Sequence, residues 1–424
     1  MSAQPSPWLS AKLVDLVPLD DKVNYGVVQP GASCDDGIPL IRVGDLDAEV
    51  IDRRALKRIA PAVDSSYSRS RLRGDEVLLA CVGSIGTVAL ADETLAGCNI
   101  ARAVARIRCG ARIDRRFLAW YLRSPACQRY FLSETRTVAQ PTLNIRQIEQ
   151  LVVPLPPPPE QRRIADILDK ADAIRRKRKE AIALTEELLR SAFLEMFGDP
   201  VTNPKGWDVK PLGTVIDKLE AGWSANGESR RRLPTEYGVL KISAVTSGIF
   251  RPEEHKAVYA GVIDRELVTP KPGDLLFSRA NTRELVAATC LVDREEPMLF
   301  LPDKIWRIVL KEEQANGPYL RFLLAHEQFR GELTKTATGT SGSMLNVSME
   351  KLRSLRAPVP SFSLQQRFAD FVWKTLRMRR RLETAGEESD RLFHSLVQRA
   401  FAGELYAPST RRCRSFTCTE DAGR

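Results

Sequence analysis

The sequence lacks the features that mark membrane, secreted and metal-binding proteins. No apolar run approaches the roughly twenty residues of a membrane-spanning helix. Residues 1–8 lack the basic start and apolar core of a signal peptide. The eight cysteines form no CxxC pair and show no metal-ligand spacing. Such cysteine usage is typical of a reducing compartment, so we expect a soluble protein of the cytoplasm.

Motifs of catalysis are missing as well. The sequence contains no GxxxxGK[ST] loop for nucleotide phosphates, no [DN]PP[YF] methyltransferase motif and no glycine fingerprint between a strand and a helix. Its three histidines, His255, His326 and His394, lie in different segments. Carboxylates are plentiful, but they fall mostly on expected helix faces, where solvated charges are the rule. The sequence therefore predicts a chain with no catalytic residues and no bound cofactor or metal of its own.

Positive charge, in contrast, is in excess. The 424 residues carry a formal net charge of +10, with an isoelectric point near 9.3. This balance points to a polyanionic partner, of which nucleic acid is the most economical, although many basic proteins bind no DNA. The hydrophobic fraction of 43% is large enough for real cores in two or three domains.

Two long helical stretches organise the chain. The first follows the proline run 156–159, contains no Pro or Gly as far as Phe197, and stops at Gly198-Asp199-Pro200. A helix of this kind is roughly 55 Å long and needs a partner helix. The second stretch starts after Pro358-x-Pro360 and has Gly403 near its end. We expect the two helices to pack together as a coiled coil, the alternative being two unrelated amphipathic helices that each lie on their own domain.

Apolar and small residues recur along both stretches at steps of three and four, which predicts a seam. Arg178 interrupts the seam of the first helix once, and Ala171, Ala181, Thr185, Ala192, Thr375 and Leu382 complete the pattern. The apolar side chains expected at the coiled-coil or subunit interface are Ile164, Ile167, Ile174, Leu188, Phe368, Phe371, Met378, Leu392 and Leu396.

The chain also repeats itself. Trp8 matches Trp207 at an offset of 199 residues, and the offset drifts only to 204 by the Pro-x-Pro segments at 154 and 358. Gln161 and Gln365 match at the starts of the two helices. The strand-like runs of the first copy are Ile38 to Val43, Glu76 to Val82, Thr87 to Ala91 and Ala103 to Arg108, and those of the second are Gly238 to Val245, Asp274 to Ser278, Val286 to Val292 and Ile305 to Leu310.

The predicted fold class is therefore α+β, with two duplicated mixed α/β domains joined and separated by two long helices packed as an antiparallel coiled coil. The expected divisions are residues 1–156 for the first domain, 157–199 for the central helix, 200–360 for the second domain, 361–405 for the C-terminal helix and 406–424 for a tail without periodicity. Because duplex DNA has a two-fold axis, such a chain is suited to placing two reading heads on one duplex.

These segments closely resemble the specificity subunits of type I restriction-modification enzymes. The resemblance rests on LNIRQIEQLVVPLPPPPEQRRIADILDKADAIRRKR, on LLRSAFLEMFGDP, on the Gly-Asp segments at 74 and 273, on the Gly-Ser-Ile-Gly turn at 83–86, and on LVQRAFAGEL at 396–405. It covers residues 8–405. Leu364-Gln365-Gln366, where the first copy has Pro159-Glu160-Gln161, departs from the commonest pattern, as does the tail.

The resemblance implies a non-catalytic subunit that reads a bipartite double-stranded DNA target, one half with each target-recognition domain. It also implies docking of two modification (methyltransferase) subunits and of motor-nuclease restriction subunits. These partners, and not this chain, use S-adenosylmethionine, ATP and Mg. A methylation-only or other methyltransferase-based phage-defence system is the open alternative. A self-contained fusion enzyme and a coiled-coil scaffold explain the sequence less well.

Residues that touch DNA are expected among Arg, Asn, Gln, Ser and Thr side chains in loops, which suit base edges and phosphates. The loop 336–344 is attractive because its glycines and small hydroxyl residues let the backbone approach phosphates. For each residue taken singly, an exposed side chain in a loop without a ligand is an equal alternative. The candidates are Arg69, Arg71, Ser84, Arg102, Arg136 and Gln140 in the first domain, and Arg230, Arg231, Arg232, Arg279, Asn281, Arg283, Thr338, Thr340 and Ser341 in the second.

Overall fold

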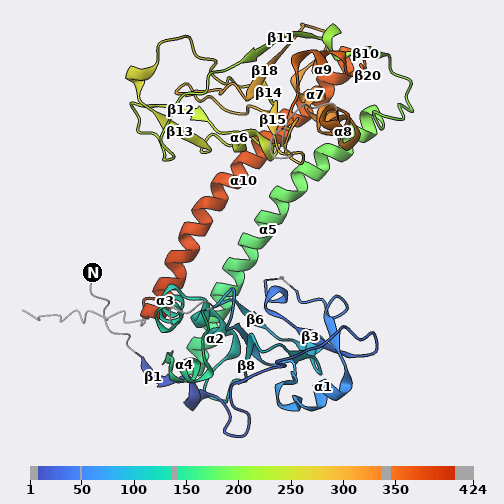
Figure 1. Ribbon diagram of the computed structural model, residues 1–424. Coiled ribbons are helices and arrows are strands. Elements are labelled where there is room, and N and C mark those ends of the chain that lie inside the picture. The colour runs from blue at the N-terminus through green and yellow to red at the C-terminus, as the bar shows by residue number, and fades with distance from the viewer. Residues whose placement is uncertain (1–7, 48–49, 136–140, 336–344, 406–424) are drawn as a thin grey trace, which may run out of the picture. The chain divides into compact units, whose positions relative to one another are not determined.

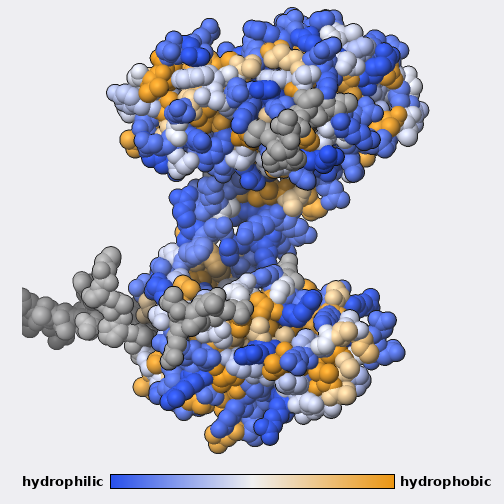
Figure 2. Space-filling model, viewed as in Figure 1, coloured by the Kyte–Doolittle hydropathy of each residue, from blue (hydrophilic) through white to orange (hydrophobic). Residues whose placement is uncertain are grey.

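The computed structural model describes residues 8–47, 50–135, 141–335 and 345–405. The chain divides into two compact units, one formed by Met1–Lys177 with Glu387–Arg424 and the other by Arg178–Gly386. Two long helices, α5 (Pro158–Phe197) and α10 (Phe362–Ala402), contribute to both units (Figure 1). Hydrophilic residues dominate the surface in view (Figure 2). Among the described residues, no helix combines the length and apolar character needed to cross a membrane.

The first unit contains two sheets beside its part of the long helices. The larger is antiparallel with the order β2-β8-β5-β6, and the smaller has the order β4-β3-β7, in which β3 and β7 are parallel. A two-stranded ribbon, β1 with β9, ties the start of the domain to the strand that precedes α5. The strands are β1 (Leu9–Lys12), β2 (Asn24–Tyr25), β3 (Ile38–Ile41), β4 (Lys57–Ile59), β5 (Val77–Ala80), β6 (Val88–Leu90), β7 (Asn99–Ile100), β8 (Val104–Ile107) and β9 (Val152–Leu155), and the short helices are α1 (Pro61–Ser65), α2 (Arg115–Arg123), α3 (Pro125–Glu134) and α4 (Ile145–Gln150).

The second unit repeats this topology and adds a two-stranded pair, β15 with β19. Its sheets have the orders β11-β18-β14-β16 and β13-β12-β17, again with one parallel pair, and the ribbon of β10 with β20 precedes α10. The predicted duplication is therefore confirmed by strand order as well as by sequence. The strands are β10 (Val209–Pro211), β11 (Ile216–Ala221), β12 (Tyr237–Leu240), β13 (His255–Val258), β14 (Leu275–Ser278), β15 (Ala280–Asn281), β16 (Thr289–Leu291), β17 (Leu299–Phe300), β18 (Ile305–Leu310), β19 (Leu345–Asn346) and β20 (Arg356–Pro358), and the short helices are α6 (Ser243–Thr246), α7 (Gly317–Ala325), α8 (Glu327–Lys335) and α9 (Met349–Ser354).

Several predicted strands were too long. The run Val286 to Val292, for example, is a strand only from Thr289 to Leu291, after a turn at 283–287. The run Gly238 to Val245 ends as a strand at Leu240, and its last residues form the short helix α6. Ala244 and Val245 are fully buried in a small core with Leu276 and Cys290. A short apolar run is compatible with either a buried strand or a buried helical turn, so its pattern could not separate the two.

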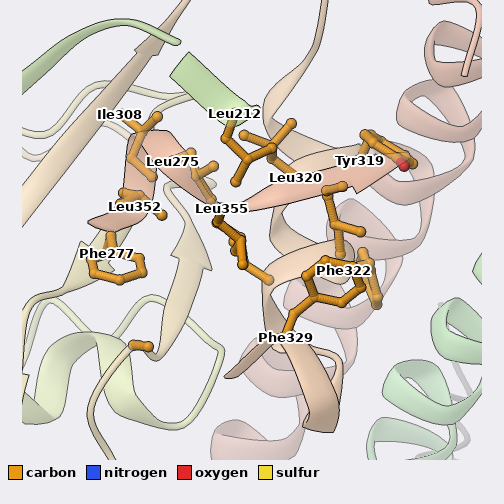
Figure 3. Close-up of a cluster of buried hydrophobic side chains, with 14 of the residues drawn as sticks. Leu212, Leu275, Phe277, Ile308, Tyr319, Leu320, Phe322, Phe329, Leu352 and Leu355 are labelled. Atoms are coloured by element: carbon orange, nitrogen blue, oxygen red, sulfur yellow. The ribbon is translucent and has the colours of Figure 1, made fainter. Parts of the chain in front are cut away.

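The main core of each unit lies between the four-stranded sheet and the short helices. In the second unit, Leu275 and Phe277 of β14 belong to the same hydrophobic cluster as Tyr319 and Phe322 of α7 (Figure 3). The same core takes in residues of α5 and α10, so the long helices are part of the domain and not an appendage. The first unit repeats this arrangement with its own sheet, α2, α3 and the other parts of the long helices.

In each unit the beginning of one long helix lies against the end of the other, so the pair is antiparallel. In the first unit, Trp120 of α2 is in edge contact with Phe393 of α10 at 5.6 Å between ring centroids, and Ile164 of α5 shares their core. In the second unit, Phe193 of α5 lies 5.7 Å from Phe368 of α10 and 5.7 Å from Tyr319. Aromatic clusters of this kind contribute both buried area and favourable ring geometry.

The seam between the helices differs in register from the sequence expectation. Ile164 and Phe368 are fully buried as expected, and Ile167, Phe371 and Leu396 are partly buried. Four other expected residues lie largely outside the seam, with exposed fractions of 55% for Ile174, 47% for Leu188, 47% for Met378 and 70% for Leu392. Their C-terminal neighbours take the inward positions, namely Arg175, Leu189, Arg379 and Phe393.

The reason for this shift is that arginines occupy seam positions. The Arg175 Nε donates to Asp390 Oδ1 at 2.6 Å, and its guanidinium lies over the Phe393 ring at 4.4 Å. The Arg178 Nη1 donates to the Ala385 carbonyl at 2.8 Å. An arginine has an aliphatic stem that packs like an apolar side chain while its head finds polar partners. A pattern that counts only apolar residues therefore predicts the ends of the seam but misplaces Ile174, Leu188, Met378 and Leu392.

A buried glutamine anchors the start of each long helix to its own domain. Gln161, 1% exposed, accepts from the Asp114 N–H at 2.7 Å and donates to the carbonyls of Arg112 and Pro156. Gln365, fully buried, accepts from the Asn316 N–H at 3.1 Å and donates to the carbonyls of Gln314 and Pro360. An amide is the only uncharged side chain that offers an acceptor and two donors at one end. The matched glutamines thus fix both helices in the same way.

Candidate nucleic-acid interface

Several first-domain candidates are connected through the segment 24–27. The Asn24 Nδ2 donates to the Arg69 carbonyl at 3.3 Å, and the Arg102 N–H donates to the Val27 carbonyl at 2.8 Å. The Tyr25 hydroxyl donates to the Leu143 carbonyl at 2.6 Å. Burial raises the pKa of this hydroxyl, so it stays protonated and keeps the bond. Arg69 and Arg102, whose side chains are exposed, thus lie on two segments that both hydrogen-bond to residues 24–27.

Ser84 is at the tip of the turn between β5 and β6. Gly83 and Gly86 have positive φ angles of 75° and 89°, which only glycine adopts without strain. The neighbouring Cys81 carbonyl accepts from the Leu143 N–H at 2.9 Å. The exposed Ser84 turn therefore lies beside the chain that resumes at residue 141. Two further candidates, Arg136 and Gln140, fall in 136–140, outside the described residues.

Arg71 differs from the other first-domain candidates because a buried carboxylate holds it. Asp64 is fully buried and forms an ion pair with the Arg71 guanidinium, while its second oxygen accepts from Asn99 Nδ2 at 2.9 Å. The hydrogen bond with Asp64 raises the pKa of Arg71. The Arg71 side chain remains 44% exposed, so the group is oriented and still accessible to a ligand.

In the second domain, three candidates lie in or beside β15. The Arg279 Nε donates to the Asp303 carbonyl at 2.8 Å, which leaves its side chain 31% exposed. Asn281 accepts from the Thr282 N–H at 2.8 Å, and Arg283 is exposed. Because β15 pairs with β19, these residues lie beside the strand that resumes after 336–344. That segment, with Thr338, Thr340 and Ser341, is outside the described residues.

The three consecutive arginines at 230–232 do not act alike. The Arg230 guanidinium donates to Glu228 at 2.6 Å and to both carboxylate oxygens of Glu236 at 2.7 Å. These hydrogen bonds lower the pKa of Glu236 to about 2 and raise that of Arg230. Arg230 is therefore committed to two carboxylates within the domain, whereas Arg231 is exposed.

The structure also shows features that the sequence did not single out. The carboxylate of Asp64 holds Arg71, seven residues further along the chain, and the imidazole of His255 holds the backbone of Arg232, 23 residues before it. Trp223 stacks on Phe300 and carries the Arg265 guanidinium on its ring at 4.6 Å. No local pattern marks Asp64 or His255, because their roles depend on partners brought close only by folding.

The described residues offer little for covalent chemistry. Burial raises the pKa of the Cys81 and Cys109 thiols to about 12, so both stay protonated and are poor nucleophiles. Within residues 8–47, 50–135, 141–335 and 345–405, no group of three or more His, Cys, Asp or Glu side chains is arranged to hold a metal ion. The arrangement is suited to binding through arginines and backbone groups.

Comparison with known proteins supports this interpretation. Residues 36–184 match the profile of the type I restriction modification DNA specificity domain. The chain is 34% identical over 203 residues to the specificity subunit of the type I restriction enzyme EcoBI of Escherichia coli, and 29% identical over 207 residues to that of EcoEI from the same organism. Each match takes in 47% of this chain, but only 43% and 35% of the two relatives. The chain thus matches less than half of the length of these curated relatives.

Solved structures share the whole fold. The S subunit of a type I restriction-modification system from M. genitalium superposes with a TM-score of 0.58 over 93% of this chain and 96% of its own, at 13% identity. A chain from a study of assembly and conformational transition of the type I system gives a TM-score of 0.52 over 95% of this chain and 100% of its own, at 19% identity. At such identities the likeness shows the fold alone. Residues 36–184 are thus similar in sequence to the type I restriction modification DNA specificity domain, and the chain shares the fold of a type I restriction-modification S subunit.

Proposed function

We propose that this chain is the sequence-specific DNA-recognition subunit of a type I restriction-modification complex. The observation that carries the proposal is the duplication: two domains whose four-stranded and three-stranded sheets have matching strand orders, each built onto both members of one antiparallel helix pair. Residues 36–184 of the same chain resemble the type I specificity domain. A duplicated reader matches the two-fold symmetry of duplex DNA. Each domain reads one half of a bipartite target.

The divisions of the chain follow from this function. Residues 1–156 and 200–360 are the two target-recognition domains, and 157–199 and 361–405 are the long helices that separate them. Residues 406–424, expected to be a tail, lie outside the described residues. The DNA-facing candidates of the first domain include those around the segment 24–27 and the Ser84 turn, and those of the second domain include Arg231 and the residues in or beside β15. The net charge of +10 favours association with the phosphate backbone. The long helices set the unspecified spacer between the two half-sites.

The exposed apolar side chains of the long helices suit the docking of partner subunits. Ile174 and Leu188 on α5 are 14 residues apart, as are Met378 and Leu392 on α10, and the two pairs match at the repeat offset of 204 residues. Apolar residues spaced by whole heptads lie on one face of a helix. Two equivalent faces call for two copies of one partner, the modification subunit, and restriction subunits join through it. These partners supply S-adenosylmethionine, ATP and Mg chemistry in the cytoplasm, and the chain itself is non-catalytic.

The test is single-molecule sequencing for N6-methyladenine in a host that expresses this chain with its modification subunit. A split motif, methylated in both halves and lost on deletion of this chain, is the expected result. Exchange of residues 8–153 for another such domain should alter only one half of the motif. The proposal fails if deletion leaves methylation unchanged. ATP-dependent cleavage of unmethylated DNA separates a complete restriction system from a methylation-only system.

A further inference from the structure

The segment 228–236 in the second domain is a turn built around two of its three arginines. Arg230 uses its Nε for Glu228 and both terminal nitrogens for Glu236, and its Nη1 also donates to the Arg231 carbonyl at 3.1 Å. Glu236 accepts in addition from the Leu233 N–H at 2.8 Å. Arg230 thus has at most one N–H left for a ligand, because a guanidinium has only five.

Arg232 closes the other side of the same turn. Its Nη1 donates to the carbonyls of Leu233 and Glu236 at 3.2 Å each. Its backbone N–H donates to the Nε2 of His255 at 3.1 Å, and His255 is only 6% exposed. Because Nε2 accepts this bond, the imidazole is neutral and its Nδ1–H donates to the Pro252 carbonyl at 2.6 Å. His255 therefore fixes the backbone next to Arg231.

Arg231 is the remaining arginine of the turn. Its side chain is exposed and makes no hydrogen bond or ion pair with the part of the chain that the structure describes. The two glutamates balance two of the three arginines, so the turn presents one uncompensated positive charge at this position. The backbone on both sides is already ordered by Arg230, Arg232 and His255. A contact made from an ordered turn loses less conformational entropy than one made from a mobile loop.

The equivalent segment of the first domain shows that the fold does not need this turn. Val27 and Trp223 are equivalent, since their N–H groups donate to the carbonyls of the matched residues Ile100 and Leu301. Between Val27 and β3 the first domain carries Asp35 and Asp36, whereas the second domain carries its three arginines before β12. The same place in two copies of one fold therefore has opposite charge. A difference of this kind indicates a role in recognition and not in folding.

We propose that Arg231 contacts DNA in the half-site that the second domain reads, and that Arg230, Arg232 and His255 are positioning residues that present it. The inference rests on the proposed DNA-recognition function and assigns one DNA contact to a single residue. The contact is a guanidinium hydrogen bond, either to a phosphate or to the acceptor edge of guanine.

The experiment uses the full chain in complex with its modification subunit. The DNA is a duplex that contains the motif methylated by the wild-type complex. Binding is measured at several salt concentrations for the wild type, R231A, R231K and the control R251A, an exposed arginine elsewhere in the same domain. R231A is expected to weaken binding about tenfold, whereas R251A stays within about twofold. H255L, which removes the acceptor, is expected to show part of the R231A defect, and H255Q, which can still accept the N–H, to recover it.

Two readouts identify the chemistry of the contact. A phosphate contact lowers the dependence of log affinity on log salt by about one, leaves the methylated motif unchanged, and is largely restored in R231K. A guanine contact instead relaxes one base pair of a single half-site. The inference is overturned if R231A matches the wild type in affinity, salt dependence and motif. If the wild-type complex methylates no split motif, the proposed function itself is refuted.

Discussion

Two adjacent leucines on α5 provide a direct test of the helix seam. Leu189 is 2% exposed in the core of the second unit, whereas Leu188 is 47% exposed. The same substitution, Leu to Ala, should therefore have very different effects at the two positions. At Leu189 it removes buried methyl groups and leaves a cavity, which costs about 2–5 kcal/mol of the free energy of unfolding. At Leu188 the loss should be about 1 kcal/mol or less, because half of the side chain already contacts water.

The assay is thermal unfolding of the purified chain followed by circular dichroism. In a unit of about 210 residues, 1 kcal/mol shifts the midpoint by about 2–4 °C. L189A should therefore melt roughly 4–20 °C below the wild type, and L188A within about 4 °C of it. L188D should also keep the fold and weaken binding of the modification subunit. Equal destabilisation by L188A and L189A, or a larger effect of L188A, would refute the seam described above.

Three further predictions concern a close approach, an anchor and an ion pair. A Cβ on Gly222 would lie 1.8 Å from the Leu301 carbonyl oxygen, so G222A should lower the unfolding free energy by more than about 3 kcal/mol, measured by urea denaturation. Q161A leaves one backbone N–H and two carbonyls of the helix start without their partner and should cost about 1–3 kcal/mol in the same assay. The Glu236 carboxyl, whose pKa is lowered to about 2 by its hydrogen bonds with Arg230, should titrate near pH 2 in carbon NMR.

Controls separate these effects from general damage. G331A is the control for G222A, because a Cβ at this helical position meets no other atom within 4 Å. The G331A substitution should stabilise the chain slightly. The folded pKa of Glu236 lies below its unfolded value, so its pairing favours the folded state above about pH 4.5 and is lost as the pH falls toward 2. R230Q should move the titration back toward its ordinary value. An unchanged midpoint in R230Q would contradict the ion pair.

The sequence predicted the large features of the fold because they depend on local punctuation and on self-similarity. Proline before residue 158 and glycine at 198 delimit α5 in the sequence and in the structure. The drift of the repeat offset was enough to predict two equivalent domains. The seam register was not accessible in this way, because Arg175 and Arg178 are polar in the sequence and yet pack inward.

The candidate site was predictable only as a set of residue types. Positions 230, 231 and 232 are all arginine, so the sequence does not distinguish them. In the structure Arg230 is bound by Glu236 and the backbone of Arg232 by His255. His255 is 23 residues from the backbone group that it binds, so only the pairing of β12 with β13 brings it there. Asp64 is only seven residues from Arg71, but Asn99, which donates to its second carboxylate oxygen, is 35 residues away. Partners such as His255 and Asn99 fix which arginine side chains remain exposed, and the sequence alone does not reveal them.

The first unit is discontinuous in the chain, and this affects the order in which the protein can fold during synthesis. Phe117 and Tyr121 of α2 pack on Phe401 of α10 at 5.4 and 5.3 Å between ring centroids. Phe401, which shields these two rings, is therefore synthesised only near the end of translation. About 210 residues of the second unit are translated in between, which takes on the order of 10–40 s. During that interval the nascent first domain has an exposed aromatic face while the second domain is still on the ribosome. The domain made first is therefore the one completed last, and slower translation should prolong its need for chaperones.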